Sequence, residues 1–319
     1  WSEVTIKENN TPLTQATIHY SDHSYVDGYC EICGKYEGID IIASGECGDN
    51  LTWTLDETGV LTISGTGAMK EYGYLFAAPG YHHHTLAPWG ANDNWREKVK
   101  TVVIEEGVTG IAEYAFYYCM NLSDVYISDT VTEIPLAAFA DCYALTSVFI
   151  PDSVTSIGQA AFSGCNSLTE IELPDSITNI GSAVFNGCSS LKEIEIPTAV
   201  TNIGAQAFKN CTKLTSVTIP GSVNSIGQSV FENCSGLESV TIPDSITSIP
   251  SYAFRNCTKL TNITIPDSAT SISAYAFYGC TSLTSMEIPE TVTSIGSYAF
   301  YGCTGLTSVT IPNSVTSIG

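Results

Sequence analysis

The chain of 319 residues has 33 acidic and 11 basic side chains, a formal net charge of −22 at pH 7, although only 14% of its residues are charged. So much negative charge repels phosphate groups, which argues against nucleic acid or an anionic membrane as partner and favours a cationic partner or simple solubility. No apolar run approaches the ~18 residues of a membrane span. Because the first residue is Trp1 rather than Met, we expect a chain processed or excised from a longer one.

The first segment, 1–46, carries one motif typical of metal sites. Cys30-Glu-Ile-Cys33-Gly resembles half of a zinc-ribbon knuckle, in which two thiolates bind one ion in a tight turn. His23 and Cys47 are the nearest candidates to complete four ligands. Because the second Cys-x-x-Cys is missing, three interpretations stay open: zinc at His23, Cys30, Cys33 and Cys47, a disulfide between Cys30 and Cys33, or free thiols.

The second segment, 47–95, predicts a β-hairpin. Strand-like residues 51–55 and 60–63 flank the turn sequence Asp56-Glu-Thr-Gly59. We expect this hairpin to cover the open end of the repeats that follow, since a bare end would expose a sheet edge and apolar core. The next stretch, 70–95, is expected to be a loop that packs through Trp89 and Trp95.

From 96 to 319 the chain predicts a solenoid, because one pattern recurs every 23 residues. Equal spacing is typical of a buried position stacked in successive coils, and independent metal ligands or catalytic thiols would not produce it. We expect the repeat cysteines to be buried free thiols that pack as small hydrophobes. Coils ~4.8 Å apart would also bring neighbouring cysteines near disulfide distances, so pairing stays an alternative. The nine cysteines are Cys119, Cys142, Cys165, Cys188, Cys211, Cys234, Cys257, Cys280 and Cys303.

Residues 237–259 show the expected course of one coil. Polar and apolar residues alternate over 239–242, which predicts a strand with one buried face, and Pro243 ends it. Ile246 and Ile249 return to the core, which suggests a second short strand. Pro250 suits the first position of a helical turn, so 250–256 are expected to form a short helix or 3₁₀ turn.

The repeat Leu-x-x-Val-x-Ile-Pro-x-x-Val-Thr-x-Ile-Gly-x-x-Ala-Phe-x-x-Cys resembles the BspA-like leucine-rich repeats of bacterial surface proteins. The resemblance implies a right-handed leucine-rich-repeat solenoid, a β-rich α/β fold with a parallel sheet on one face and nine full repeats plus a partial one. It also implies secretion or display at the cell surface, with adhesion or host-protein binding proposed for several members. It implies no catalytic residues. The last coil stops at Gly319, before its own Ala-Phe-x-x-Cys, and we expect the native chain to continue or to have been truncated there.

One group of side chains departs from the repeat on the expected concave face. Most coils carry Ser or Thr between the core positions of the strand, but two adjacent coils carry glutamates. Like charges facing each other across a sheet are destabilising, so a lysine-rich partner or a hard cation could compensate them. The alternative is a solvated acidic patch. The candidate binding residues here are Tyr126, Phe149, Glu170, Glu172, Glu193 and Glu195.

A second group consists of tyrosines that share two repeat positions near the C-terminal end. Stacked tyrosines suit contact with a protein or a glycan, and they equally suit packing between coils. This tyrosine patch comprises Tyr252, Tyr275, Tyr278, Tyr298 and Tyr301. Lys209, Glu232 and Arg255 also share one position, and we interpret them as a structural ladder of surface salt bridges, each worth little.

These features favour a non-catalytic binding module that uses its concave face for adhesion or for a host or protein partner. The alternative is a structural stalk, about 50 Å long for ten strands at ~4.8 Å each, that displays another domain. An enzyme is disfavoured, since no Ser/His/Asp, Cys/His or paired acid–base group stands out. All five histidines precede the solenoid. The expected ligand is a protein or glycan, with no cofactor required apart from the zinc considered above.

Overall fold

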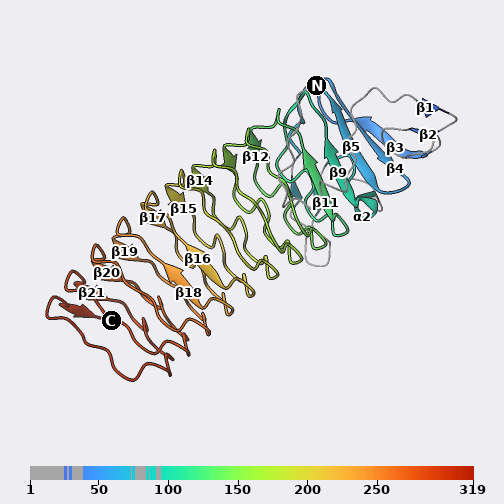
Figure 1. Ribbon diagram of the computed structural model, residues 1–319. Helices are drawn as coiled ribbons and strands as arrows, with labels where there is room; N and C mark the ends of the chain where they lie inside the picture. Colours follow the sequence, from blue (N-terminus) through green and yellow to red (C-terminus); the bar gives the residue numbers. More distant parts are fainter. Residues whose placement is uncertain are drawn as a thin grey trace.

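The computed structural model describes residues 39–72, 87–90 and 95–319, together with the backbone of four short strands at 25–26, 29–30, 74–75 and 84–85. The coils follow one another along a single elongated solenoid (Figure 1). The N-terminal strands lie at one end of this array and the C-terminal coil lies at the other. The predicted solenoid is confirmed.

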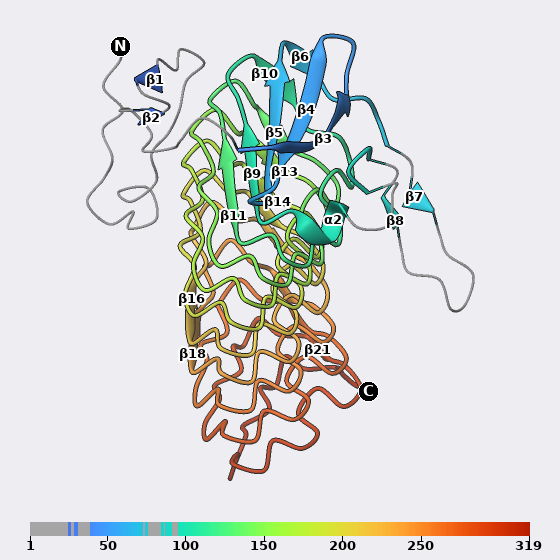
Figure 2. The ribbon, with the colours of Figure 1, turned by 90° about the vertical axis from the view of Figure 1, so that its right-hand side faces the viewer.

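The predicted hairpin forms the N-terminal end of the solenoid. Its strands β4 (Leu51–Asp56) and β5 (Val60–Gly65) pair antiparallel. The Asp56 carboxylate accepts hydrogen bonds from the backbone N–H groups of Thr58 and Val60, at 2.9 and 3.0 Å, and these bonds fix the turn. β5 pairs in parallel with the first solenoid strand, β9 (Thr101–Ile104), so the hairpin continues the solenoid's own sheet. Figure 2 shows it covering the first coil, as predicted.

Two further strands complete this five-stranded sheet, whose order is β11-β9-β5-β4-β3. The edge strand β3 (Ile41–Glu46) pairs with β4, so the sheet begins within the first predicted segment, 1–46. At the other edge, β11 (Asp124–Ile127) pairs in parallel with β9. The other short elements of this end are β1 (Tyr25–Val26), β2 (Tyr29–Cys30), β6 (Gly67–Ala68), β7 (Tyr74–Leu75), β8 (His84–Thr85), α2 (Trp95–Lys98) and β10 (Val108–Gly110).

The remaining coils are joined by short parallel strands in a 23-residue register and by further backbone hydrogen bonds outside these strands. The second strand predicted for each coil is present, and Ile134, Ile157 and their equivalents pair from coil to coil. On the β11 face, β16 (Ser216–Thr218) pairs with β18 (Ser239–Thr241). The second strands are β12 (Glu133–Ile134), β13 (Ser156–Ile157), β14 (Asn179–Ile180), β15 (Asn202–Ile203), β17 (Ser225–Ile226), β19 (Ser248–Ile249), β20 (Ser271–Ile272), β21 (Ser294–Ile295) and β22 (Ser317–Ile318).

A continuous stack of aromatic rings runs through the core. From Phe116 to Phe300 the centroids of successive phenylalanine rings lie 5.1–6.0 Å apart, with interplanar angles of 0–15°. Trp89 heads the stack, 5.4 Å from Phe116, and its indole N–H donates to the carbonyl of Ala115 at 2.7 Å. The cap therefore closes the solenoid by extending its core. Trp89, predicted to pack the loop, does so by stacking on the first phenylalanine of the core.

The nine repeat cysteines are buried free thiols, as predicted. Each from Cys142 to Cys303 donates its S–H to the carbonyl of the phenylalanine 26 residues earlier, at 3.0–3.2 Å. A buried carbonyl without enough partners is costly, so these thiols do more than fill space. They connect each coil to the one before it.

The segment expected to be a short helix or 3₁₀ turn is a series of β-turns. In the coil around 250–257, the N–H groups of residues 253, 255 and 257 bond to carbonyls three residues back. Those of residues 252, 254 and 256 donate to the following coil. Tyr252 and Asn256 adopt φ values of 60° and 58°, which a right-handed helix excludes. The alternation lets every second amide join two coils, which a helix would prevent.

Candidate functional site

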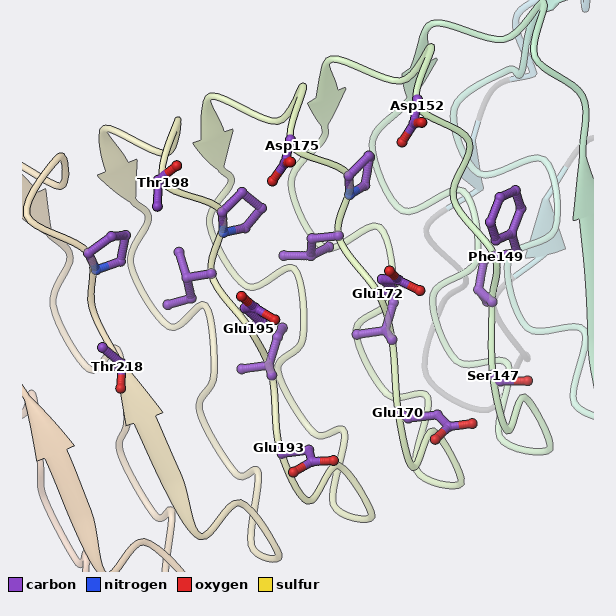
Figure 3. A pocket seen from close by; sticks show the side chains of 18 of the residues that line it. Ser147, Phe149, Asp152, Glu170, Glu172, Asp175, Glu193, Glu195, Thr198 and Thr218 are labelled. Atoms are coloured by element: carbon purple, nitrogen blue, oxygen red, sulfur yellow. The ribbon is translucent and has the colours of Figure 1, made fainter. Parts of the chain in front are cut away.

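The sheet face between β11 and β16 is hollowed into an open groove of about 1250 Å³ (Figure 3). The groove spans five coils, from Asp124 to Pro220. All six residues predicted for the concave face line it: Tyr126, Phe149, Glu170, Glu172, Glu193 and Glu195.

The alternation of inward and outward side chains along each coil positions the four glutamates, although residues 170–172 and 193–195 form no named strand. Ile171 and Ile194 point into the core and are buried, so the residues on either side of them face outward. All four glutamate side chains are exposed. Figure 3 shows two rows along the solenoid, one with Glu170 and Glu193 and the other with Glu172 and Glu195. The 23-residue register thus turns a sequence repeat into parallel rows of carboxylates.

Three aspartates that the prediction did not include add to the charge of this groove. Asp152 and Asp175 follow the proline that ends each strand, where the sequence indicates only a turn, although their 23-residue spacing was a usable signal. None of the described residues that line the groove is Lys, Arg or His. The seven acidic residues are Asp124, Asp152, Glu170, Glu172, Asp175, Glu193 and Glu195.

No basic side chain of the described chain neutralises the glutamates of the groove. The ion pairs found in the described part of the chain involve other acidic residues, outside the groove. Backbone pairing is sparse across the groove, where Phe149 and Glu172 form an isolated parallel bridge. Pairing is also missing at residues 262–264 and 308–310, where the outward side chains are uncharged, so charge repulsion does not account for it. The groove therefore presents unpaired negative charge to solvent.

The groove also has an aromatic end. Phe149 is 41% exposed, and Tyr126, on the preceding coil, is half-buried. Burial raises the pKa of Tyr126, and the nearby Asp124 carboxylate raises it further. The tyrosine therefore stays a neutral hydroxyl at physiological pH. Apolar and acidic surfaces meet within one groove.

The predicted metal sites find no geometric support in the described part of the chain. In that part, no group of three or more His, Cys, Asp or Glu is placed to hold an ion. The carboxylates of the groove thus spread along a surface rather than converge on one cation.

The predicted zinc ligands lie largely outside the described residues. His23 and Cys33 are not described, and only the backbone of Cys30 is, in β2. Cys47 lies in the core, and burial raises the pKa of its thiol to about 11. Zinc binds the thiolate, so ligation by Cys47 would require this thiol to lose its proton. Zinc at the Cys30/Cys33 motif stays a prediction.

The tyrosine patch is built by stacking between coils. The ring centroids of Tyr252 and Tyr275 lie 4.9 Å apart, and those of Tyr275 and Tyr298 lie 5.1 Å apart. Tyr278 and Tyr301 form a second stack at 5.2 Å. The tyrosine rings of successive coils therefore pack against one another. Contact of this patch with a partner stays a prediction.

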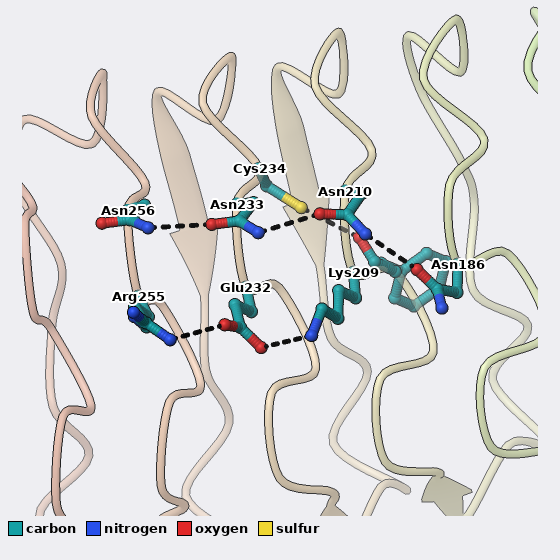
Figure 4. A network of polar contacts seen from close by, with 9 residues as sticks. Asn186, Lys209, Asn210, Glu232, Asn233, Cys234, Arg255 and Asn256 are labelled. Carbon is teal, nitrogen blue, oxygen red and sulfur yellow. Dashed lines mark hydrogen bonds and ion pairs between the residues drawn. The ribbon is translucent and has the colours of Figure 1, made fainter.

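A polar network crosses the turns beside this patch (Figure 4). The Glu232 carboxylate lies 2.9 Å from Lys209 Nζ and 3.1 Å from Arg255 Nη1. Only 8% of the Glu232 side chain is exposed, whereas Lys209 and Arg255 are 26% and 38% exposed, so the expected surface ladder is instead a buried carboxylate held by two partly exposed cations. The sequence could not show this, because side-chain depth depends on the turn geometry. Above these three residues, Asn186, Asn210, Asn233 and Asn256 form an amide ladder.

Replacing Glu232 by Ala is expected to lower the free energy of unfolding by about 2 kcal/mol, the usual order for hydrogen bonds to a charged group. The replacement removes a buried carboxylate that bonds to Lys209 and Arg255, while these two cations keep part of their contact with water. Urea unfolding followed by circular dichroism measures the loss. The exposed Glu238, paired with Lys259 at 3.6 Å, is the matched control, and its replacement by Ala should cost less than about 1 kcal/mol. Equal losses for the two variants would contradict this role of the buried carboxylate.

No helix in the part of the chain that the structure describes is long and apolar enough to cross a membrane. A family model, the BspA type leucine-rich repeat region, matches residues 109–238 and 231–319, in six copies. The search of curated proteins found no match.

Several solved structures of bacterial leucine-rich repeat proteins are similar to this chain. A leucine-rich repeat protein from Eubacterium ventriosum is 24% identical, with 87% of this chain and 94% of that one covered and a TM-score of 0.46. One from Bacteroides ovatus is 27% identical, with coverage of 85% and 89% and a TM-score of 0.43. A leucine-rich cell surface protein from Faecalibacterium prausnitzii is 26% identical, with coverage of 85% and 95% and a TM-score of 0.38.

Proposed function

This chain belongs to the BspA-type leucine-rich repeat family, and on that premise we propose that it is a non-catalytic binding module of a secreted or surface-displayed bacterial protein. Its ligand is a basic segment of a protein partner, held in the acidic groove. Adhesion through such a partner is the biological role.

The observation that carries this proposal is the unpaired charge of the groove. Seven acidic residues lie on the first four of the five coils that form the groove, and no basic residue is found among the described residues that line it. Lysine and arginine side chains would complement this surface, which favours encounter with a basic partner and selects against acidic ones. Attraction between exposed charges is screened by salt, so binding should weaken as ionic strength rises.

The test replaces the four glutamates by the residues of a neutral coil. Glu170→Ser, Glu172→Thr, Glu193→Ser and Glu195→Thr copy Ser216 and Thr218, which occupy the same repeat positions in the adjacent coil. The probe is a fluorescent lysine-rich dodecapeptide, with binding measured by anisotropy at 50 and 300 mM salt. We expect the variant to bind at least tenfold more weakly than the unmodified chain at low salt and to lose most of the salt dependence.

A matched control separates groove binding from attraction by the net charge of −22. The control variant neutralises four exposed acidic residues outside the groove: Glu238, Asp267, Glu287 and Glu290. Both variants carry the same net charge, so only the position of the removed charges differs. Equal loss of affinity in both would overturn the proposal, and unchanged binding in the groove variant would favour the stalk.

A further inference from the structure

One row of the groove changes chemistry halfway along its length. Tyr126, Phe149, Glu172 and Glu195 occupy the same repeat position on four consecutive coils. All four line the groove. The row is therefore aromatic over its first two coils and acidic over the next two, whereas the same position in the following coils is Thr218 and Thr241.

The fold itself does not require an aromatic ring at Phe149. The stacked rings of the core come from another repeat position, represented in neighbouring coils by Phe139 and Phe162, which are fully buried. Phe149 lies on the outward side of its strand, between buried Val148 and Ile150, and remains 41% exposed. Exposed phenylalanine gains free energy when a partner covers it, at roughly 25 cal/mol per Å² of apolar surface removed from water.

We propose that the partner of the groove is an extended basic segment that also carries an apolar side chain, seated on Tyr126 and Phe149. This inference rests on the proposed function and specifies the ligand of the same groove. Charge complementarity selects basic residues for the half that contains Glu172 and Glu195. The aromatic half also carries Asp124 and Asp152, but it holds the exposed ring of Phe149, so it selects one apolar residue at that ring.

The repeat geometry sets the spacing within this segment. The midpoint of the aromatic pair and the midpoint of the acidic pair are two coils apart, or ~9.6 Å at ~4.8 Å per coil. An extended peptide advances ~3.3 Å per residue and turns alternate side chains to the same face. Basic residues two and four positions along from the apolar one therefore reach Glu172 and Glu195.

The test compares two fluorescent hexapeptides of sequence X-Ser-Lys-Ser-Lys-Ser, in which X is Trp or Ser. We expect the unmodified chain to bind the Trp peptide about tenfold more tightly, which corresponds to about 1.4 kcal/mol. The Phe149→Thr variant copies Thr218 at the same repeat position, so its fold should be preserved. It should bind both peptides as weakly as the unmodified chain binds the Ser peptide.

The outcomes separate this inference from the proposed function. A Trp preference that persists in Phe149→Thr, or a Ser peptide that binds the unmodified chain as tightly as the Trp peptide, would overturn the apolar seat. The groove proposal would still stand if the four glutamate replacements weakened both peptides. If those replacements weakened neither peptide, the proposed function itself would fail.

Discussion

Raising the pH from 8 to 11 is expected to unfold the solenoid. Burial raises the pKa of the thiols of Cys119 and Cys234 from 9.0 to about 12. It also raises the pKa of the other seven repeat cysteines. In the unfolded chain these thiols ionise near their ordinary pKa. Above pH 9 the unfolded chain therefore releases protons that the folded chain retains, and stability falls as pH rises.

The number of buried repeat cysteines makes the loss of stability with rising pH steep. Each thiol that ionises only after unfolding removes up to about 1.4 kcal/mol of stability per pH unit. Nine thiols acting together remove roughly 12 kcal/mol per pH unit, which is comparable to the whole stability of many proteins. Below about pH 7.5 the thiols are almost entirely neutral in both states and contribute little pH dependence. The measurement is the urea midpoint by circular dichroism at half-unit steps from pH 8 to 11, under a reductant.

A triple variant with Cys211→Ser, Cys234→Ser and Cys257→Ser isolates the contribution of the thiols from that of tyrosine ionisation. Serine retains a donor for the phenylalanine carbonyls that these thiols contact at 3.0–3.2 Å, and it does not titrate in this range. Removing three of the nine repeat thiols should remove about one third of their contribution to the alkaline loss of stability. An unchanged slope would assign alkaline unfolding to other groups.

The sequence predicts the coil but not the contacts that cross between coils. The 23-residue period identifies the second strand of each coil and the outward row that contains Glu172 and Glu195, and both are found, whereas the first strand is formed only in some coils, among them β11, β16 and β18. The period does not predict the backbone φ angles at the turn. Tyr252, Ala183 and Gln206 all adopt positive φ, although none of these residue types signals it. The bonds of the cysteines and the burial of Glu232 depend on that turn, so they could not be predicted.

The candidate site shows the same division. Alternation along a strand predicts that Phe149 and the four glutamates face outward, because side-chain period is a local property. Asp152 and Asp175 belong to the groove because the chain after each proline stays on the same side of the solenoid, as Figure 3 shows. That is a property of how coils stack. Binding sites on a solenoid are therefore best sought by comparing all positions of successive repeats, including turns.

Replacing Phe231 by Ala is expected to lower the free energy of unfolding by about 3–5 kcal/mol, the usual loss for a phenylalanine removed from a core. Phe231 is fully buried and lies between Phe208 and Phe254, at 5.5 and 5.6 Å. Phe300 is the matched control, because it is only partly buried and stacks on one side, 5.7 Å from Phe277. Its replacement by Ala should cost less than half as much in the same urea titration, and equal losses would contradict a stability set by neighbouring coils.

The position of Phe231 along the solenoid has a consequence for binding. Coils of a solenoid are stabilised by their nearest neighbours, so a weak interface in the middle divides one unfolding transition into two. The groove lies wholly before Phe231, between Asp124 and Pro220, on coils that remain attached to the hairpin cap. In Phe231→Ala we therefore expect the lysine-rich peptide to stay bound through the first transition and to dissociate only in the second. Release in the first transition would show that the groove requires the C-terminal coils.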